Sequence, residues 1–146
     1  MDGLELPVRL HAPNLKPPSH TRSGDAGLDL CAATDVVLKP FERALIPAGI
    51  SMAIPKGYAG FVLPRSGLAL HHGFSLVNSP GLIDSNYRGE VQVIAINLDP
   101  QETFTIRQGD RIAQLVIMRV EEPNIVLCDS LDETARGSQG FGSSGR

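Results

Sequence analysis

Arg65, Ser66 and Gly67 follow one another in the segment PRSG at residues 64–67, and together they offer the groups that an anion site needs. The guanidinium of Arg65 is a fixed fork of donors that suits phosphate oxygens. Ser66 adds a hydroxyl, and Gly67 lets a ligand approach the backbone. If a helix starts here, its free N–H groups contribute as well. A capped helix start with a solvated arginine is the alternative interpretation.

The segment NSPGLIDSNYRGEVQV at residues 78–93 is typical of strand, turn and strand. We expect a hairpin with DSNYRG at its tip, where free backbone groups could recognise the edge of a flat base as another strand would. Asp84 could orient and polarise a water molecule as a general base, and Tyr87 could pack against a sugar. The alternative is a hairpin whose tip is merely polar.

Two polar residues interrupt apolar strands. Gln114 in GDRIAQ shares a strand face with Ile112 and Val116, and a buried amide needs hydrogen-bond partners. Asp29 in AGLDLCAA needs a partner or a nearby cation, because an isolated carboxylate in a core is costly. Each could reach a ligand, or could instead be a structural glutamine and a structural ion pair.

The C-terminal segment RGSQGFGSSGR at residues 136–146 carries one aromatic ring among glycines. Phe141 could stack on a base, and Arg136 adds positive charge. Serine hydroxyls and free N–H groups nearby resemble a phosphate-binding nest. The other candidate binding residues here are Gly140, Gly142, Ser143 and Ser144. A disordered chain end would have the same composition.

These residues need elements to position them. Short apolar runs separated by proline and glycine, the last of them NIVLCD at residues 124–129, predict many short strands in an all-β sandwich or barrel. One short helix is predicted in SGLALHHG near residues 66–73. Ser66 could cap its start and Gly73 could end it in a left-handed conformation.

Two strands are apolar on both faces. In GEVQVIAINL, one face carries Val91, Val93 and Ala95, and the other carries apolar residues too. RIAQLVIMRV at residues 111–120 has the same property. Since antiparallel sheets usually have one wet face, such strands must lie centrally or face another subunit, which predicts an oligomer.

Length, charge and cysteine content limit the number of domains, the class of function and the cellular compartment. The 146 residues suit one domain, and a net charge of −3 argues against a protein that neutralises phosphates along a nucleic-acid duplex. Cys31 and Cys128 lack CxxC spacing and are interpreted as buried thiols in a reducing compartment; no structural zinc site is expected. Without a signal-peptide pattern or an apolar run long enough to span a membrane, we expect a soluble cytoplasmic protein.

AGLDLCAA, PRSG, NSPGLIDSNYRGEV, GDRIAQL and RGSQGFGSSG together resemble the five ordered motifs of the trimeric dUTP diphosphatases, from about residue 24 to residue 145. The resemblance implies a jelly-roll-like β-barrel at residues 1–134 and a flexible arm at 135–146. It implies a homotrimer whose active sites each draw on all three chains. It also implies hydrolysis of dUTP to dUMP and diphosphate with Mg²⁺, which keeps uracil out of DNA and supplies the thymidylate precursor.

The resemblance also implies a role for each candidate residue. Asp84 would activate the attacking water, Tyr87 would pack on deoxyribose and exclude a 2′-hydroxyl, and Asp29 would hold water on Mg²⁺. Uracil would be read by Asn78 and by backbone groups around Leu82, Ile83 and Gln92. The α- and β-phosphates would be bound by Arg65, Ser66, Gly67 and, directly or through metal-bound waters, Gln114.

The same resemblance makes the arm a lid. It would come from a neighbouring subunit, with Phe141 stacked on uracil and the serines taking the γ-phosphate beside Arg136. Ser144 stands where the family usually has threonine, and Gln139 has no assigned role. Two alternatives stay open. A dCTP deaminase or bifunctional relative is usually longer, and IDSNYRG favours the plain diphosphatase. A binding regulator without catalysis would not need Asp84 and the complete tail.

Overall fold

The computed structural model describes residues 3–145 of the chain, and within that range it contains short strands and one helix. In chain order these are β1 Val8–Leu10, β2 Leu28–Cys31, β3 Val36–Leu38, β4 Arg43–Pro47, β5 Ile50–Met52, β6 Tyr58–Leu63, α1 Ser66–His72, β7 Phe74–Leu76, β8 Gly81–Ile83, β9 Gln92–Asn97, β10 Phe104–Ile106 and β11 Arg111–Arg119. The predicted all-β class with one short helix is confirmed, and the architecture is consistent with a jelly roll.

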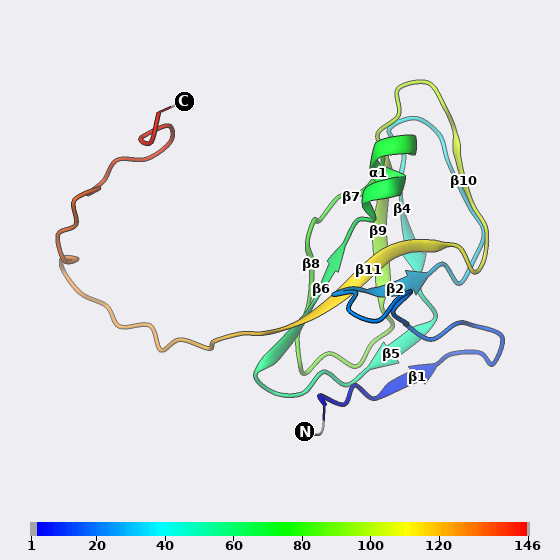
Figure 1. Ribbon diagram of the computed structural model, residues 1–146, viewed down its shortest axis with the longest axis horizontal. Coiled ribbons are helices and arrows are strands. Elements are labelled where there is room, and N and C mark those ends of the chain that lie inside the picture. Colours follow the sequence, from blue (N-terminus) through cyan, green and yellow to red (C-terminus); the bar gives the residue numbers. More distant parts are fainter. Residues whose placement is uncertain (1–2, 146) are drawn as a thin grey trace.

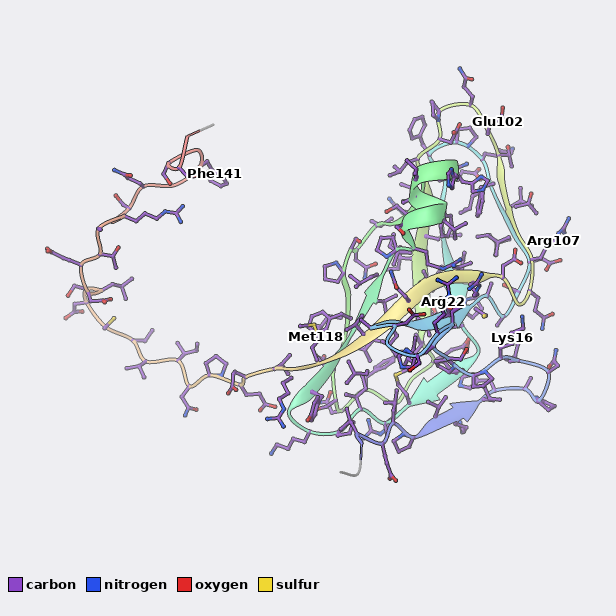
Figure 2. All side chains as sticks on the ribbon, in the orientation of Figure 1. Lys16, Arg22, Glu102, Arg107, Met118 and Phe141 are labelled. Atoms are coloured by element: carbon purple, nitrogen blue, oxygen red, sulfur yellow. The ribbon has the colours of Figure 1, made fainter. Side chains whose placement is uncertain are left out.

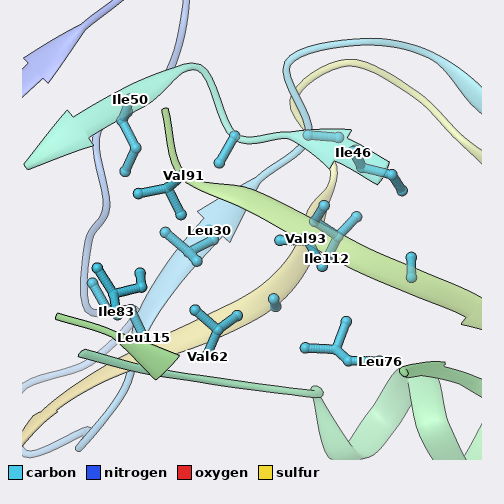
Figure 3. Packing of buried hydrophobic residues seen from close by; sticks show 14 of the residues in the cluster. Leu30, Ile46, Ile50, Val62, Leu76, Ile83, Val91, Val93, Ile112 and Leu115 are labelled. Carbon is cyan, nitrogen blue, oxygen red and sulfur yellow. The ribbon is translucent and has the colours of Figure 1, made fainter. Parts of the chain in front are cut away.

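All strand pairs are antiparallel and form two larger and two smaller sheets (Figure 1). The four-stranded sheet has the order β2-β11-β6-β8, and the three-stranded sheet has the order β4-β9-β7. The strand pairs β1-β5 and β10-β3 extend the body at its ends. Side chains of the two larger sheets meet in the core, where Leu30, Val62 and Leu115 of one sheet face Val93 of the other (Figure 3).

Strand β11 is the element that aligns several predicted site residues. It lies between β2 and β6, and its Gln114 is opposite Asp29 of β2 on one side and Leu63 of β6 on the other. The PRSG segment begins directly after Leu63. The segments around Asp29, Gln114 and PRSG are far apart in the sequence, but they therefore lie side by side at one end of the sheet.

Helix α1 ends as predicted but starts differently. Gly73 adopts the left-handed conformation (φ 63°), and its N–H donates to the carbonyl of Ala69 at 3.1 Å. The predicted cap by Ser66 is wrong, because the N-cap residue is Arg65 and no side chain caps the helix. Arg65 still has the extended backbone of the preceding strand (φ −89°, ψ 127°), so the helix boundary falls one residue earlier than predicted. The Ser66 hydroxyl is therefore not used in capping.

The predicted hairpin of residues 78–93 is also wrong in its pairing. Strand β8 pairs with β6 in the larger sheet, whereas β9 pairs with β4 and β7 in the other sheet. Residues 84–91, called the connector from here on, cross from one sheet to the other. Strands β8 and β9 therefore belong to different sheets, and the connector does not close a hairpin between them.

Two further expectations fail near the C-terminus. NIVLCD forms no strand, and residues 121–145 are all exposed in an extended segment that leaves the body after β11 (Figure 1). Cys128 is consequently exposed, while Cys31 is half-buried, so the prediction of two buried thiols is wrong. A strand needs a partner strand, and among residues 3–145 the segment pairs with none.

The two doubly apolar strands lie centrally, as one of the two predicted options required. Val91, Val93 and Ala95 are buried, but Ile94 and Ile96 on the opposite face of β9 are only half-buried, and Leu98, directly after the strand, is 50% exposed. On β11 the exposed fraction of Met118 is 51%, at the point where the chain leaves the body (Figure 2). Apolar surface thus remains on the outer faces of central strands. No helix within residues 3–145 is long and apolar enough to cross a membrane.

Candidate functional site

A cavity of about 600 Å³ lies where β2, β11 and the end of β6 meet, and three arginines line it, Arg22, Arg65 and Arg111. We call it the arginine-lined cavity. It brings together the residues that three separate motifs predicted for phosphates and metal: Asp29, Arg65, Ser66, Gly67 and Gln114. The aligned register across β11 is the reason that these side chains meet.

Asp29 is the electrostatic centre of this cavity. Its Oδ1 lies 3.6 Å from Nε of Arg65, and its Oδ2 lies 3.5 Å from Nη1 of Arg111. The hydroxyl of Thr21 donates to Oδ2 at 2.6 Å. The Asp29 side chain is only 15% exposed, so the expectation that this carboxylate needs a charged partner is confirmed. The carboxylate holds two guanidinium groups in place at the cavity wall.

Gln114 joins β11 to the PRSG segment. Its Nε2 donates to the carbonyl of Pro64 at 3.0 Å, and the residue is half-buried. Its neighbour Gly27 leaves the necessary room, since a Cβ at that position would lie 2.6 Å from Oε1 of Gln114. The predicted need of this amide for a partner is confirmed, and Gly27 is a residue that the sequence did not single out.

A second cavity, of about 260 Å³, lies beside the connector, and we call it the connector cavity. Its lining includes the predicted residues Leu82, Ile83, Asp84, Tyr87 and Gln92. Strand β8 is the edge strand of its sheet, so one side of its backbone has no partner strand. The absence of β8–β9 pairing leaves room there for a flat ligand that makes strand-like hydrogen bonds.

The connector folds tightly around Tyr87. The N–H of Tyr87 donates to the carbonyl of Asp84 at 3.1 Å, and its hydroxyl donates to the carbonyl of Glu90 at 2.9 Å. A Cβ on Gly89 would lie 2.4 Å from the Tyr87 hydroxyl oxygen, so the ring can lie across the backbone only because residue 89 is glycine. The ring is thereby held against the connector, and Asp84 is exposed beside it.

Asn78 is not among the residues that line the connector cavity. It is exposed before the start of β8, and a Cβ on Gly81 would lie 3.3 Å from its Nδ2. Its amide therefore lies against the start of the edge strand, next to the cavity and not in its wall.

The candidate residues of the arm lie away from both cavities. Phe141 is completely exposed near the end of the extended segment (Figure 2). Arg136 donates from Nε to the carbonyl of Gln139 at 3.0 Å, and Ser143 donates its N–H to the carbonyl of Gly140. Gly142 and Ser144 lie in the same turn-rich stretch. A single chain does not bring these residues to the others.

Arg111 and Thr21 are functional candidates that sequence reasoning missed. Arg111 lies within the quoted motif GDRIAQ, where a charged residue opens a doubly apolar strand, and that contrast was an available signal. Thr21 lies eight residues before Asp29 in a loop without a recognisable pattern. The bridge between Ser19 and Asp29 and the hydrogen bonds of the Thr21 hydroxyl with Asp29 and Arg111 bring that loop to the cavity.

The donor set of the arginine-lined cavity suits Mg²⁺ bound largely through ligand oxygens and water. Its carboxylates come from Asp25 and Asp29, and both oxygens of Asp29 already contact protein donors or cations. Mg²⁺ commonly keeps several waters and binds through few carboxylates together with phosphates. Within residues 3–145, no three His, Cys, Asp or Glu side chains are grouped as a metal site.

Comparisons with known proteins identify the family of the chain. A family model described as dUTPase matches residues 14–145. The chain is 49% identical to the deoxyuridine 5′-triphosphate nucleotidohydrolase of Rhodococcus erythropolis over 144 residues, which cover 99% of this chain and 88% of the relative. The identity is 53% to the same-named protein of Corynebacterium efficiens over 146 residues, with 100% and 80% covered.

Solved structures are similar over nearly the whole chain. The dUTPase of Staphylococcus bacteriophage 80alpha with dUPNHPP has a TM-score of 0.90 and 30% identity, covering 97% of this chain and 99% of that chain. A mutant dUTPase from phage phi11 of S. aureus, described with a structural Mg(II) ion, has a TM-score of 0.80 and 28% identity, covering 87% and 98%.

Proposed function

The chain belongs to the dUTPase family, and from that membership we propose that it hydrolyses dUTP to dUMP and diphosphate with Mg²⁺. The observation that carries this proposal is the pair of cavities. One is lined by arginines and suits phosphates, and the other offers an unpaired strand edge beside a tyrosine and an exposed carboxylate. In the cell, this reaction keeps uracil out of DNA and supplies the thymidylate precursor.

The triphosphate binds in the arginine-lined cavity. Arg65 provides a guanidinium that Asp29 already orients, and the Ser66 hydroxyl is free of a capping role. Gly67 leaves open space, since a Cβ there would have no atom within 4 Å. Gln114 completes the set from the neighbouring strand. Such positioning of charge matters most in phosphoryl transfer, which asks little covalent chemistry of the protein.

Asp29 and Asp25 are the residues that would hold Mg²⁺, Asp29 through water. When bound, the ion neutralises and orients the triphosphate. Both oxygens of Asp29 are engaged by Thr21 and the arginines, which favours contact through a water molecule over direct coordination.

The uracil and its sugar bind in the connector cavity. Backbone groups at Leu82, Ile83 and Gln92 read the edge of the base, with Asn78 beside them, and the tight cavity excludes a thymine methyl. The Tyr87 ring packs on deoxyribose and leaves no room for a 2′-hydroxyl. Asp84 accepts the proton of the water that attacks the α-phosphorus, and diphosphate leaves.

The active site is assembled from more than one chain in a homotrimer. In support, the exposed arm bears its candidate residues away from both cavities of its own chain (Figure 1). Apolar side chains such as Leu98, directly after β9, and Met118 on β11 also remain half exposed. The arm of a neighbouring subunit closes over the nucleotide, with Phe141 on uracil. Its phosphate-side contacts are Arg136, Gly140, Gly142, Ser143 and Ser144.

An assay of nucleotide hydrolysis tests the proposal. With dUTP and Mg²⁺ the protein should release dUMP and diphosphate, with little turnover of dTTP, dCTP or UTP. Equal turnover of all four pyrimidine nucleotides would overturn it. Ammonia release from dCTP would instead identify a deaminase, and tight dUTP binding without products would identify a regulator. The protein is expected to act on nucleotides in the cytoplasm and not on DNA or membranes, in keeping with its net charge of −3.

A further inference from the structure

Three side chains form a hydrogen-bonded row, Ser51, His11 and Glu90. Glu90 lines the connector cavity, whereas His11 and Ser51 line neither of the two cavities. Nε2 of His11 lies 2.8 Å from Oγ of Ser51, and Nδ1 lies 3.1 Å from Oε2 of Glu90. Ser51 is 7% exposed, and the side chains of His11 and Glu90 are 26% and 29% exposed. A neutral imidazole with its proton on Nδ1 satisfies both contacts, donating to the carboxylate and accepting from the hydroxyl.

The row joins the connector to the β1-β5 sheet. His11 directly follows β1, and its N–H donates to the carbonyl of Gly49 at 2.9 Å. Ser51 is the central residue of β5, opposite Arg9 of β1. Both are therefore held by a strand pair that belongs to neither of the two larger sheets. Glu90 is the part of the row that lies in the connector.

Glu90 is also the residue that holds Tyr87, because its backbone carbonyl accepts the Tyr87 hydroxyl at 2.9 Å. The next residue, Val91, is fixed by its own backbone, donating to Ile50 and accepting from Ala48. Glu90 lies between this fixed Val91 and Tyr87. The contact of its side chain with His11 further restrains its backbone carbonyl, which in turn orients the Tyr87 ring.

We propose that His11 and Glu90 are positioning residues that set the sugar selectivity of the site by holding Tyr87. This inference rests on the proposed dUTP hydrolysis and on Tyr87 as the group that excludes a 2′-hydroxyl. The order serine, histidine and carboxylate resembles a nucleophilic triad, but burial of Ser51 in the middle of β5 keeps its hydroxyl from a substrate. Ser51 orients the imidazole. His11 does not line the connector cavity, and Glu90, at its wall, acts here through the carbonyl that accepts the Tyr87 hydroxyl.

The test compares kcat/KM for dUTP and for UTP in purified full-length variants. His11→Ala and Glu90→Ala should lower the dUTP-to-UTP ratio by roughly three- to tenfold, the range that one net hydrogen bond supports. Glu90→Gln should retain most of the ratio, because the amide oxygen can still accept from the imidazole. His71→Ala, at an exposed histidine on α1, is the matched control and should change nothing.

A double-mutant cycle separates positioning from general loosening of the fold. If His11 acts through the Tyr87 hydroxyl, then His11→Ala should lower the ratio in the native background and have no further effect in Tyr87→Phe. Equal losses in both backgrounds, or an unchanged ratio in His11→Ala with normal melting temperature, would overturn the inference. Failure of the unmodified protein to hydrolyse dUTP at all would instead overturn the proposed function.

Discussion

Asp29 and Arg65 form an ion pair across an intervening strand, with Oδ1 of the first 3.6 Å from Nε of the second. Strand β11 lies between β2, which carries Asp29, and β6, which ends two residues before Arg65; its Gln114 is in register with Asp29 and Leu63. The same carboxylate also contacts Arg111. A single acidic side chain thus orients two of the three guanidinium groups that line the cavity.

Asp29→Asn should therefore reduce kcat/KM for dUTP by about tenfold or more, since removing one partner of a poorly exposed charge pair disturbs the others. The matched control is Asp35→Asn. Asp35 pairs with Arg107 at 3.5 Å, but these side chains are 61% and 70% exposed, and such surface pairs contribute little. Steady-state kinetics at several Mg²⁺ concentrations make the comparison. Equal activity of the two variants would contradict a role for Asp29 in substrate or metal binding.

Asp84→Asn should lower kcat by about 10² to 10⁴, the usual contribution of a general base, while binding of a dUTP analogue stays close to normal. Asp84 is exposed in the connector, so this nearly isosteric change should not alter folding. Single-turnover kinetics and calorimetric titration with dUpNHpp measure the two effects separately. A near-normal kcat would refute its role as the base.

Tyr87→Ala should increase turnover of UTP relative to dUTP, because the ring that packs on deoxyribose is then absent. The change also removes the hydrogen bond to the Glu90 carbonyl. Competition assays with both nucleotides report the selectivity directly. Retention of full discrimination would show that another residue excludes the 2′-hydroxyl.

Truncation after Thr134 should reduce kcat by orders of magnitude, because the proposed lid would be missing. Residues 135–145 are all exposed in the chain, so the melting temperature and the oligomeric state should not change. Phe141→Ala in the full-length chain is the finer variant and should reproduce part of the loss. Full activity of the truncated protein would contradict the lid.

The two cysteines should differ in alkylation rate. Burial is the main cause that raises the pKa of the Cys31 thiol, against a smaller opposing effect of Lys16, so less of the reactive thiolate is present at pH 8. Cys128 is exposed on the arm. Mass spectrometry after brief iodoacetamide treatment should find Cys128 modified first. The labelling of Cys31 should increase as the pH is raised. Faster modification of Cys31 would indicate that its strand opens readily.

Contiguous motifs made much of the site predictable. PRSG and the residues around Asp84 carry their chemistry in adjacent positions, and Asp29 and Gln114 were conspicuous as polar residues in apolar strands. Gly27 and Gly89 could not be predicted in this way, because their importance comes from close approach to Gln114 and Tyr87. That approach depends on strand register and on the fold of the connector, which are tertiary properties.

The errors in the predicted fold have a common physical origin. Two apolar runs joined by a polar turn predict a hairpin, yet β8 and β9 each pair with other strands. NIVLCD has strand composition but no partner strand in the part of the chain that the structure describes. Strand pairing is decided by competition among all available edges and, in an oligomer, by edges of other chains. A local pattern contains no information about that competition.

The length of the exposed segment after Arg119 has a kinetic consequence. From there to Phe141 an extended chain spans about 70 Å, enough to reach a neighbouring subunit in the proposed trimer. In the proposed closure, the aromatic ring would be presented to the site as a tethered ligand, at an effective concentration on the order of millimolar for a flexible tether. On opening of that site to release product, the ring would leave without diffusing away. A free peptide of the same sequence would have to be supplied at a comparable concentration to replace it.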